Sequence, residues 1–498
     1  MATFNQKKIR RHSSVTVALT VLLIAAVILL NGIFGALVQR YGWYVNMNPT
    51  LRYPATDAFY TYVDTYVMSE LTAGGEIRIL FCEEAESLRA SDETALVLAT
   101  AEELAARYEG RVSIDYLNVV EQPKLARELG VDDSTDVVFL CGDRSKTCSL
   151  DEFYLFSSED TSEPMAYSGH RRFATVLRSV VCSSLPVCYF TVNHGESFPD
   201  YEMLYAAADA GYDVKSLDLL YSEIPEDCAM LITYNPHRDF THRDGVADTS
   251  ELERLEAYMQ SGGRYMVFVS ADTFSAGGFS NLEGYLSEWG VTFAHETGNT
   301  GIEECYLVRD PAHALTTDGY TVLARVETEG KAADVLAPVL TESDATVAVS
   351  NATVIRPTEG KGEVIVTTLL SGYAGAEAWA AGRAVGRADE KGYAFMTLSE
   401  RAVGEKTAYL LACSSTDFAC EESMQSAVFD NKSVFMSVVA GMGKTDVPLH
   451  IAPQPIMDDT IRTMTTAYAN TVTWVAVLLP SVLLLAAGLW VLARRRYS

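Results

Sequence analysis

Basic residues are scarce in this 498-residue chain, which has 38 Lys and Arg against 66 Asp and Glu and a formal net charge of −28. The two ends are the exception, because residues 1–14 and 493–498 carry only positive charges. Removing those seven basic residues leaves a net charge of −35 for the remainder of the chain. A surface this acidic repels phosphate backbones, so we expect no nucleic-acid partner.

Paired cysteine motifs are missing as well. None of the nine cysteines forms a Cys-x-x-Cys motif, which excludes zinc ribbons and dithiol redox motifs. Cys82, Cys188 and Cys228 lie in apolar runs, where cysteine usually serves as a small core residue. A disulfide between Cys141 and Cys148 stays open as an alternative, although the odd number leaves at least one thiol unpaired within the chain. We expect no metal ion and no cofactor.

Long apolar runs are present at both ends of the chain. Residues 15–38 are uncharged, and residues 472–492 form a second run that contains Pro480 and Gly488. A transmembrane helix needs about 20 residues and tolerates Pro and Gly. The sequence therefore predicts one transmembrane helix at each end. For the first run, the competing interpretation is a cleaved signal peptide, but the apolar core of a signal peptide would be shorter. For the second run, the competing interpretation is a buried helix.

The seven basic residues of the two tails flank the outer ends of the apolar runs, and few basic residues flank the inner ends. By the positive-inside rule, both termini are then cytoplasmic. This places the protein in the cell (plasma or inner) membrane, with residues of about 39–471 extracytoplasmic.

The chain is organised around residues 186–196, an apolar run that ends abruptly in Asn-His-Gly-Glu. Buried parallel strands are continuous Val/Phe/Tyr runs of this kind, and a following glycine allows a tight turn. Further strands are predicted at 213–217, 229–234 and 264–269, with helices at 201–210 and 251–261 between them. Regular alternation of strand and helix predicts a parallel sheet covered by helices.

An earlier β-α-β-α-β pattern spans residues 77–141 and is compatible with a thioredoxin-like domain. Its expected elements are strands at 77–82, 112–118 and 136–141 and helices at 91–108 and 123–129. Thiol exchange requires two neighbouring cysteines and a lowered thiol pKa. The first strand is instead followed by Cys82-Glu83-Glu84-Ala85. We therefore interpret this domain as redox-inactive.

The central region resembles the auxiliary domain of GldG-like (gliding-motility-type) ABC transporter auxiliary proteins. The resemblance covers about residues 77–434, and its strongest parts are His194-Gly195-Glu196, Ile224-Pro225 and the helix-Gly-Gly-strand segment that begins at Leu255. The segments that carry it, in order, are YFTVNHGE, AGYDVKSLDL, IPEDCAMLI, ELERLEAYMQSGGRYMVFVS and NLEGYLSEWGV. Family members accompany a bacterial ABC ATPase and its permease, so the resemblance implies these two partners and a non-catalytic role.

The expected fold class is α/β: an exported thioredoxin-like domain plus a glutamine-amidotransferase-like parallel-sheet domain, with one transmembrane helix at each end. The predicted domains are a basic tail (1–14), a transmembrane helix (15–38), a juxtamembrane stalk (39–75), the thioredoxin-like domain (76–160), the ABC-transporter auxiliary domain (165–440), a linker (441–471), a transmembrane helix (472–492) and a basic tail (493–498). Residues 371–391 are rich in Ala and Gly and are interpreted as a flexible surface excursion.

His194, Gly195 and Glu196 are the candidate ligand-binding residues. An imidazole and a carboxylate at the carboxyl end of a parallel strand lie where α/β sheets bind ligands. A metal site would need a third or fourth ligand, for which His170, His237, His242 and Asp239 are candidates that lie far away in the sequence. The favoured alternative is a turn in which His194 and Glu196 satisfy nearby backbone groups and Gly195 supplies an unusual backbone conformation.

The sequence predicts no catalytic residues. An amidotransferase needs a cysteine on a sharp strand-to-helix turn, and the two candidate turns, Tyr234-Asn235-Pro236 and Ser270-Ala271-Asp272, contain none. Gly441-Met442-Gly443-Lys444-Thr445 ends like a P-loop, but Val438 occupies the position of the first required glycine. We interpret that segment as a chance match.

The expected function is that of a non-catalytic, membrane-anchored auxiliary subunit of a bacterial ABC transporter, which presents a large extracytoplasmic domain to the permease or the substrate. One alternative is an exported ligand-binding or envelope-interaction module. A less favoured alternative is an exported hydrolase or amidotransferase-like enzyme that uses His194, Glu196 and Ser270.

Overall fold

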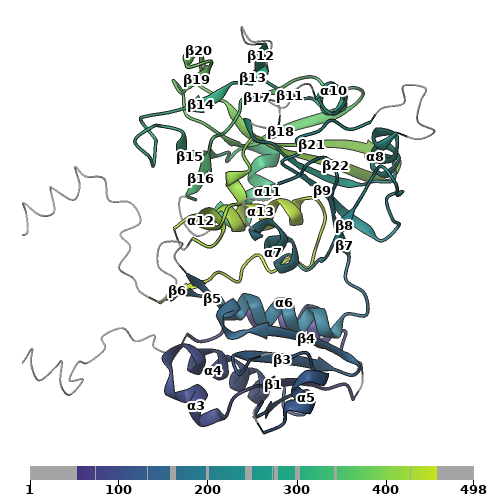
Figure 1. Ribbon diagram of the computed structural model, residues 1–498, viewed down its shortest axis with the longest axis vertical. Coiled ribbons are helices and arrows are strands. Elements are labelled where there is room, and N and C mark those ends of the chain that lie inside the picture. The colour runs from purple at the N-terminus through teal and green to yellow at the C-terminus, as the bar shows by residue number, and fades with distance from the viewer. Residues whose placement is uncertain are drawn as a thin grey trace, which may run out of the picture. The chain divides into compact units, whose positions relative to one another are not determined.

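The computed structural model describes residues 53–456, except 73, 120, 132, 157–163, 198–200, 242–249, 272, 274–278, 298–302, 341–344 and 427 (Figure 1). The chain divides into two units, residues 1–54 and 55–498.

A four-stranded sheet with the order β2-β1-β3-β4 forms the first part of this unit. β1 and β2 are parallel, whereas β3 pairs antiparallel with both β1 and β4. The elements of this part are α2 (Asp57–Tyr62), the π-helix η1 (Val63–Met68), β1 (Ile77–Phe81), α3 (Ala85–Ala90), α4 (Asp92–Arg107), β2 (Val112–Tyr116), α5 (Pro123–Glu128), β3 (Asp136–Cys141), β4 (Arg144–Ser149), the 3-10 helix η2 (Leu150–Phe153) and α6 (Gly169–Val181). The predicted β-α-β-α-β pattern is confirmed.

The helix α6 covers β3 and β4 of the first sheet (Figure 1). Its Phe173 meets Phe139 of β3 edge-on, with ring centroids 5.6 Å apart, and lies 5.0 Å from the ring of Phe153. All three rings are fully buried. The predicted auxiliary domain of residues 165–440 includes α6, but these contacts make α6 part of the first sheet's core. The predicted division of domains otherwise stays a prediction.

An eleven-stranded sheet forms the larger part, with the order β16-β15-β18-β21-β22-β10-β9-β7-β8, and β17 pairs with β21 on one side and with β11 on the other. The strands β22, β10, β9, β7 and β8 are mutually parallel, and β21 runs antiparallel to β22. The strands are β7 (Val187–Thr191), β8 (Asp213–Leu217), β9 (Cys228–Tyr234), β10 (Arg264–Phe268), β11 (Val291–Phe293), β15 (Thr321–Val326), β16 (Val347–Ser350), β17 (Ile355–Pro357), β18 (Val364–Ser371), β21 (Ala394–Val403) and β22 (Lys406–Cys413).

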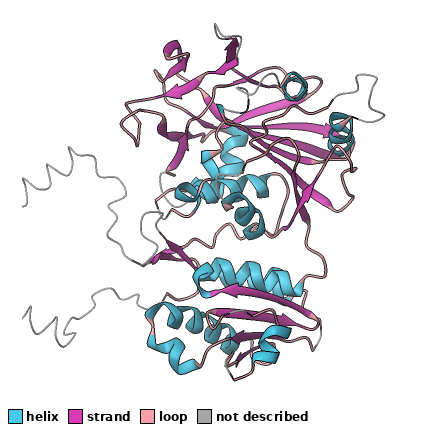
Figure 2. Cartoon of the chain, in the orientation of Figure 1, coloured by secondary structure: helices cyan, strands magenta, loops and turns pink. Residues whose placement is uncertain are grey.

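Helices cover both faces of the parallel strands (Figure 2). Successive strand side chains point to opposite faces: Phe190 of β7 joins the core beneath α7, α11, α12 and α13, and Tyr189 joins the core beneath α8 and α10. The helices are α7 (Glu202–Asp209), α8 (Glu251–Gln260), α10 (Ser280–Glu288), α11 (Gly330–Leu340), the 3-10 helix η3 (Asp417–Ala419), α12 (Glu421–Met424) and α13 (Asn431–Gly441). The predicted parallel arrangement of β7, β8, β9 and β10 is confirmed, but these strands are part of a mixed sheet rather than of a parallel one.

Three small sheets complete the described residues: β5-β6-β23, β12-β13 and β14-β19-β20. Their strands are β5 (Tyr154–Phe156), β6 (Pro164–Tyr167), β23 (Gln454–Pro455), β12 (His295–Thr297), β13 (Glu303–Cys305), β14 (Leu307–Arg309), β19 (Glu377–Ala380) and β20 (Arg383–Arg387). The interpretation of residues 371–391 as a flexible excursion is wrong in part. Buried Ala378 and Ala380 anchor β19 against β14, and the hairpin β19–β20 fills this segment.

The prediction of one transmembrane helix at each end is wrong on this structure. Within residues 53–456 no described helix has the length and apolarity to cross a membrane. The helices α4 and α6 have 16 and 13 residues, fewer than the roughly 20 that a span needs, and both carry charged side chains. The segments 15–38 and 472–492 lie outside the described residues.

Other predictions depended on those helices and are corrected with them. They are the membrane anchor, the cell-membrane localisation and the placement of both termini in the cytoplasm with residues 39–471 outside. The fold class is corrected to a mixed α/β chain with large sheets.

Candidate functional site

The candidate site lies where the chain reverses its direction across the parallel strands. β7 pairs with β8 on one side and with β9 on the other. The chain passes from β7 through α7 to β8 and then crosses back to form β9, which makes the β7–β9 boundary a topological switch point. Open α/β sheets bind ligands outside the carboxyl ends of the strands at such a point. The predicted residues His194, Gly195 and Glu196 follow β7 directly and lie there.

The turn after β7 depends on left-handed backbone at two positions. Asn193 has a φ of 78° and Gly195 a φ of 76°. A Cβ at Gly195 would lie 3.2 Å from the Cβ of His237, and the His237 N–H donates a 2.8 Å hydrogen bond to the carbonyl of His194. Gly195 therefore provides both the positive φ and the close approach of the segment that follows β9.

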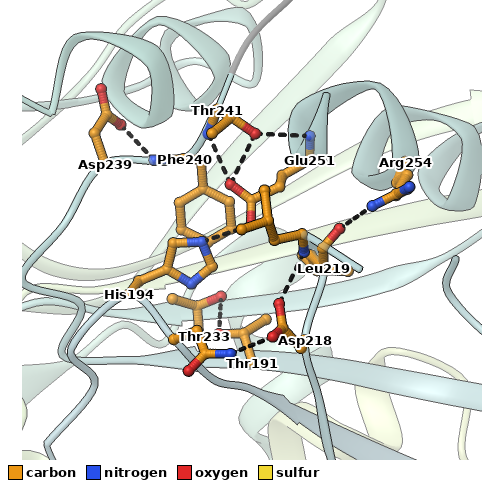
Figure 3. A network of polar contacts seen from close by, with 12 residues as sticks. Thr191, His194, Asp218, Leu219, Thr233, Asp239, Phe240, Thr241, Glu251 and Arg254 are labelled. Atoms are coloured by element: carbon orange, nitrogen blue, oxygen red, sulfur yellow. Dashed lines mark hydrogen bonds and ion pairs between the residues drawn. The ribbon is translucent and has the colours of Figure 1, made fainter. Parts of the chain in front are cut away.

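The imidazole of His194 has a carboxylate at each nitrogen. Nδ1 lies 2.9 Å from Oε1 of Glu196, and Nε2 lies 2.9 Å from Oε1 of Glu251. The ring stacks on Phe240 with centroids 4.0 Å apart and an interplanar angle of 6° (Figure 3). The side chains of His194, Glu196 and Glu251 are 5%, 4% and 3% exposed. The three charged groups are thus closed off from solvent.

Both carboxylates accept further hydrogen bonds. Glu196 Oε2 accepts the N–H of His194 at 2.7 Å, and its Oε1 accepts the hydroxyl of Thr191 at 3.0 Å. Glu251 Oε2 accepts the N–H and the hydroxyl of Thr241 at 2.8 and 2.9 Å (Figure 3). A carboxylate that accepts several hydrogen bonds is stabilised in its charged form, so Glu196 and Glu251 both remain ionised at neutral pH.

A row of hydroxyl groups continues from Glu196 into the sheet. The Oγ1 atoms of Thr191 and Thr233 are 3.0 Å apart, and the hydroxyl of Tyr265 donates to Thr233 at 3.0 Å. Each hydroxyl carries one proton. Because Thr191 donates to Glu196, Thr233 must donate to Thr191. The row ends in the fully buried core at Tyr265 and has no free donor.

The hydrogen bonds also determine the charge of the cluster. Burial alone would lower the pKa of His194, but the hydrogen bonds that its ring donates to Glu196 and Glu251 outweigh burial and raise this pKa to about 9. Burial would raise the pKa of either carboxyl, yet the contact with His194 holds both below their usual value. At neutral pH an imidazolium therefore lies between two carboxylates, with a net charge of −1.

Glu251 belongs to this cluster but was not among the predicted site residues. It is the first residue of α8, whose N-cap Ser250 accepts the N–H of Glu253 at 3.0 Å. Negative charge is favourable at a helix N-terminus. A helix that follows a parallel strand begins at the carboxyl edge of the sheet, so the first turn of the predicted helix 251–261 held the available signal. The stacking partner Phe240 had no such signal.

A second polar group lies beside this cluster, at the ends of β9 and β10. Ser270 Oγ donates to Oδ1 of Asn235 at 2.7 Å, and Asn235 Nδ2 donates to Ser197 Oγ at 2.9 Å. Ser197 Oγ lies 3.3 Å from Nε2 of His237. The Ser270 hydroxyl donates to Asn235, and both ring nitrogens of His194 contact carboxylates, so His194 does not serve as a base for Ser270 as the predicted hydrolase alternative requires.

The structure separates the candidate metal ligands. His170 is on α6, where burial lowers its pKa to about 4 and its ring packs 5.2 Å from that of Phe59. Asp239 accepts two backbone N–H groups in the first turn of α10, at 2.9 and 3.0 Å. His242 lies outside the described residues. Among the residues that are described, no group of three or more His, Cys, Asp or Glu could hold a metal ion.

The P-loop-like segment does not form a phosphate-binding loop. Gly441 is the last residue of α13, so the segment follows a helix rather than preceding one. Lys444 is buried, pairs with Asp446 and lies 5.0 Å from the centroid of the Tyr212 ring. Its ammonium group is therefore used internally.

All nine cysteines are free thiols, so the disulfide alternative for Cys141 and Cys148 is wrong. In the β3–β4 hairpin Cys141 lies opposite Arg144 and Cys148 opposite Val137, at different ends of the pairing. Burial and the nearby Asp136 raise the pKa of Cys82 to about 11. A thiol with so high a pKa is protonated at neutral pH.

No protein-family model matches the chain, and no curated protein matches it. Among solved structures it is similar to the mmIFT52 N-terminal domain, to PurLQS from Thermotoga maritima and to SMU.1228c, at 16%, 11% and 12% sequence identity. The alignments cover 52%, 51% and 51% of this chain and 98% of each of the other chains, with TM-scores of 0.35, 0.28 and 0.27. Similarities this low carry no argument about the fold or function of this chain.

Proposed function

We propose that this protein is a non-catalytic accessory component of an ABC transporter, which associates with the ABC ATPase and a multi-span permease. The class of partner comes from the sequence resemblance described above. The observation that supports a non-catalytic role is the closed His194 cluster at the β7–β9 switch point. That position is where an α/β sheet of this kind would present reactive groups to a substrate.

The closed cluster leaves His194 without a chemical function toward a ligand. An imidazolium that donates both N–H groups to carboxylates has no lone pair for a metal ion or for a substrate proton. A general base must be able to reach the proton that it removes. With Phe240 on one face and 5% of its side chain exposed, His194 instead fixes the turn after β7 to the start of α8.

The first sheet supports the same proposal. Thiol exchange needs a thiolate, and burial raises the pKa of Cys82 to about 11. The other cysteines are also free thiols, and none stands with Cys82 in a Cys-x-x-Cys arrangement that could resolve a mixed disulfide. We therefore assign the four-stranded sheet a structural or partner-binding role.

The test is recovery of partners from the native source. The tagged full-length protein is purified from a detergent extract of its own cells, and the co-purifying proteins are identified by mass spectrometry. We expect an ABC ATPase and a multi-span permease, both absent from the untagged parent strain. Tagging the recovered ATPase should return this protein. Repeated preparations that lack both transporter components would overturn the proposal and favour a free-standing ligand-binding module.

A serine hydrolase is the second candidate, on one observation. Ser197 Oγ lies 3.3 Å from Nε2 of His237 at the solvent-facing side of the switch point, and Asn235 contacts the same hydroxyl. Among the described residues no carboxylate pairs with His237, whereas a triad needs one to orient the imidazole. Hydrolysis of p-nitrophenyl esters that the wild type performs and both Ser197→Ala and His237→Ala abolish would establish this candidate.

A further inference from the structure

A cavity of about 220 Å3 lies beside the carboxyl end of β10, away from the His194 cluster. Ala271 forms its border at the large sheet, and Glu304 of β13, Leu307 of β14, Tyr320 and Trp379 of β19 line it. Pockets for drug-sized ligands have volumes of about 300–1,000 Å3. The size therefore suits a smaller molecule or a single side chain.

Paired strands hold the walls of the cavity. Leu307 and Trp379 are direct partners across the antiparallel strands β14 and β19. Ala381, in the turn between β19 and β20, has a φ of 50° and lines the same cavity. Figure 1 shows β13, β14, β19 and β20 gathered in one region. The lining is thus part of the folded framework rather than of a single loop.

A hydrogen bond to Glu377 holds the indole of Trp379 in place, and the guanidinium of Arg309 already lies near the ring. Its Nε1 donates to Oε2 of Glu377 at 2.9 Å, and the guanidinium of Arg309 lies 5.2 Å from its ring centroid. Glu377 in turn pairs with Arg387 at 3.2 Å. Trp is the aromatic side chain that attracts cations most strongly.

Glu304 supplies a carboxylate without a counter-ion. It is half-buried, and among the described residues it has neither an ion pair nor a side-chain hydrogen bond. Its cross-strand neighbour Glu296 pairs with Arg383 at 2.7 Å, so the nearby arginine is already used. A partly buried carboxylate is favoured when a cation lies beside it.

We propose that this cavity binds a small organic ammonium group, held by the carboxylate of Glu304 and by the aromatic rings of Trp379 and Tyr320. Rings and a carboxylate together attract ammonium ions and disfavour anions. The chain's net charge of −28 adds a long-range attraction for cations. The inference does not depend on the proposed transporter role, because it concerns a different part of the fold.

The ammonium group has two possible sources, a free small molecule or the lysine side chain of a partner. Isothermal titration of the full-length protein with choline, tetramethylammonium and N-acetyl-lysine methylamide tells them apart by affinity. The neutral carbon analogue of choline, 3,3-dimethylbutan-1-ol, is the control for shape. We expect the cations to bind at least about fivefold more tightly than the neutral analogue, since a desolvated cation–π contact and an ion pair both depend on charge. Equal affinities, or no binding of any cation at millimolar concentration, would overturn the proposal.

Substitutions of the lining residues Glu304 and Trp379 test whether the cations bind in this cavity. Glu304→Gln should weaken choline binding at least about fivefold, whereas Glu109→Gln, an exposed position in the four-stranded part, should leave it unchanged. Trp379→Phe should weaken binding less than Trp379→Leu, because Phe retains a π face. Thermal unfolding identifies variants that fail to fold. If Glu304→Gln binds choline like the wild type, or if the Phe and Leu variants are equivalent while folded, the ligand does not occupy this cavity.

Discussion

His194 is a charged residue in a place where charge is costly. Moving an ion out of water costs several kcal/mol even after relaxation, and this cost is offset only by well-placed partners. The two 2.9 Å contacts and the hydrogen bonds behind each carboxylate supply such partners. Removing the imidazole leaves Glu196 and Glu251 buried and without a cation, a worse state than an apolar replacement of all three groups.

The first prediction therefore concerns His194→Ala, which should lower the free energy of unfolding by about 3–5 kcal/mol. Urea unfolding at pH 7, followed by circular dichroism, measures the change. His450→Ala, at an exposed histidine, is the control and should shift stability by less than about 0.5 kcal/mol. Equal effects of the two substitutions would contradict the structural role of the cluster.

The second prediction is the pH dependence that this cluster causes. The pKa of His194 is raised to about 9 from an ordinary 6.5, so the folded state binds more protons between these values. Stability from this group is complete below pH 6.5 and is lost as the pH rises through 9, by about 3 kcal/mol in all. The two carboxyls, with lowered pKa values, lose their contribution only as the pH falls below about 4.5.

Unfolding of the wild type and of His194→Gln at pH 6 and pH 9.5 isolates this contribution. The wild type should lose about 3 kcal/mol more than the variant across this interval, because other titrating groups are common to both. Parallel pH profiles would show that His194 does not change its protonation on unfolding.

At the scale of single elements, the turn after β7 determines whether the site forms. Gly195 at φ 76° and Gly110 at φ 75° have nearly the same backbone conformation. A Cβ at Gly110 meets nothing within 4 Å, whereas at Gly195 it approaches His237 to 3.2 Å. The two positions therefore separate the cost of left-handed backbone from the cost of a close contact.

The third prediction compares alanine at these two glycines. Left-handed backbone at a non-glycine residue costs about 1–2 kcal/mol, so both variants should lose about that much stability. Gly195→Ala should lose more than Gly110→Ala, because the segment after β9 must also move away. Chemical denaturation gives both values. If Gly110→Ala lowers the free energy of unfolding as much as Gly195→Ala or more, the segment at His237 moves aside without an energetic penalty.

The elements predicted from sequence are those whose burial determines their pattern. β7, β9 and β10 are buried on both faces and read as continuous apolar runs. β4 has three exposed residues in sequence, Arg144, Ser145 and Lys146, and the edge hairpin strand β20 has four exposed positions out of five. Neither strand leaves a hydrophobic signal, so both were missed. α11 was missed because Pro338 lies inside it, although its buried side chains Ala332, Val335, Leu336 and Val339 keep helical spacing.

The site was predicted in part for a related reason. His194, Gly195 and Glu196 form one turn, and their proximity is local. Glu251 lies 57 residues away from His194 in sequence and reaches it only because α8 starts at the same edge of the sheet. Phe240 and Thr241 arrive through an irregular segment with no pattern of its own. Partners that lie far apart in the sequence can be predicted only when the order of the strands in the sheet is known, and no local sequence pattern gives that order.

At the scale of the whole described chain, α6 connects the two large sheets. It packs on β3 and β4, while its arginines reach residues of the later part. Arg172 pairs with Glu152 and, at 3.4 Å, with Asp209 of α7, and Arg178 pairs with Glu70 at 2.6 Å. Asp446, which follows α13, lies 3.4 Å from Arg178. Each arginine therefore contacts carboxylates from both parts.

The fourth prediction is that these two arginines make the parts unfold together. Their side chains are 18% and 10% exposed, so their ion pairs are far less screened than surface pairs. In the double variant Arg172→Met/Arg178→Met, hydrogen exchange should show β1–β4 opening at lower urea than β7–β10, with one calorimetric transition becoming two. Methionine retains much of the apolar volume, so the change removes charge more than packing. Arg78→Met/Arg89→Met, at surface ion pairs more than 50% exposed on the arginine side, is the matched control and should unfold like the wild type. A single transition with uniform loss of protection in the α6 double variant would show that apolar packing, rather than these ion pairs, couples the two sheets.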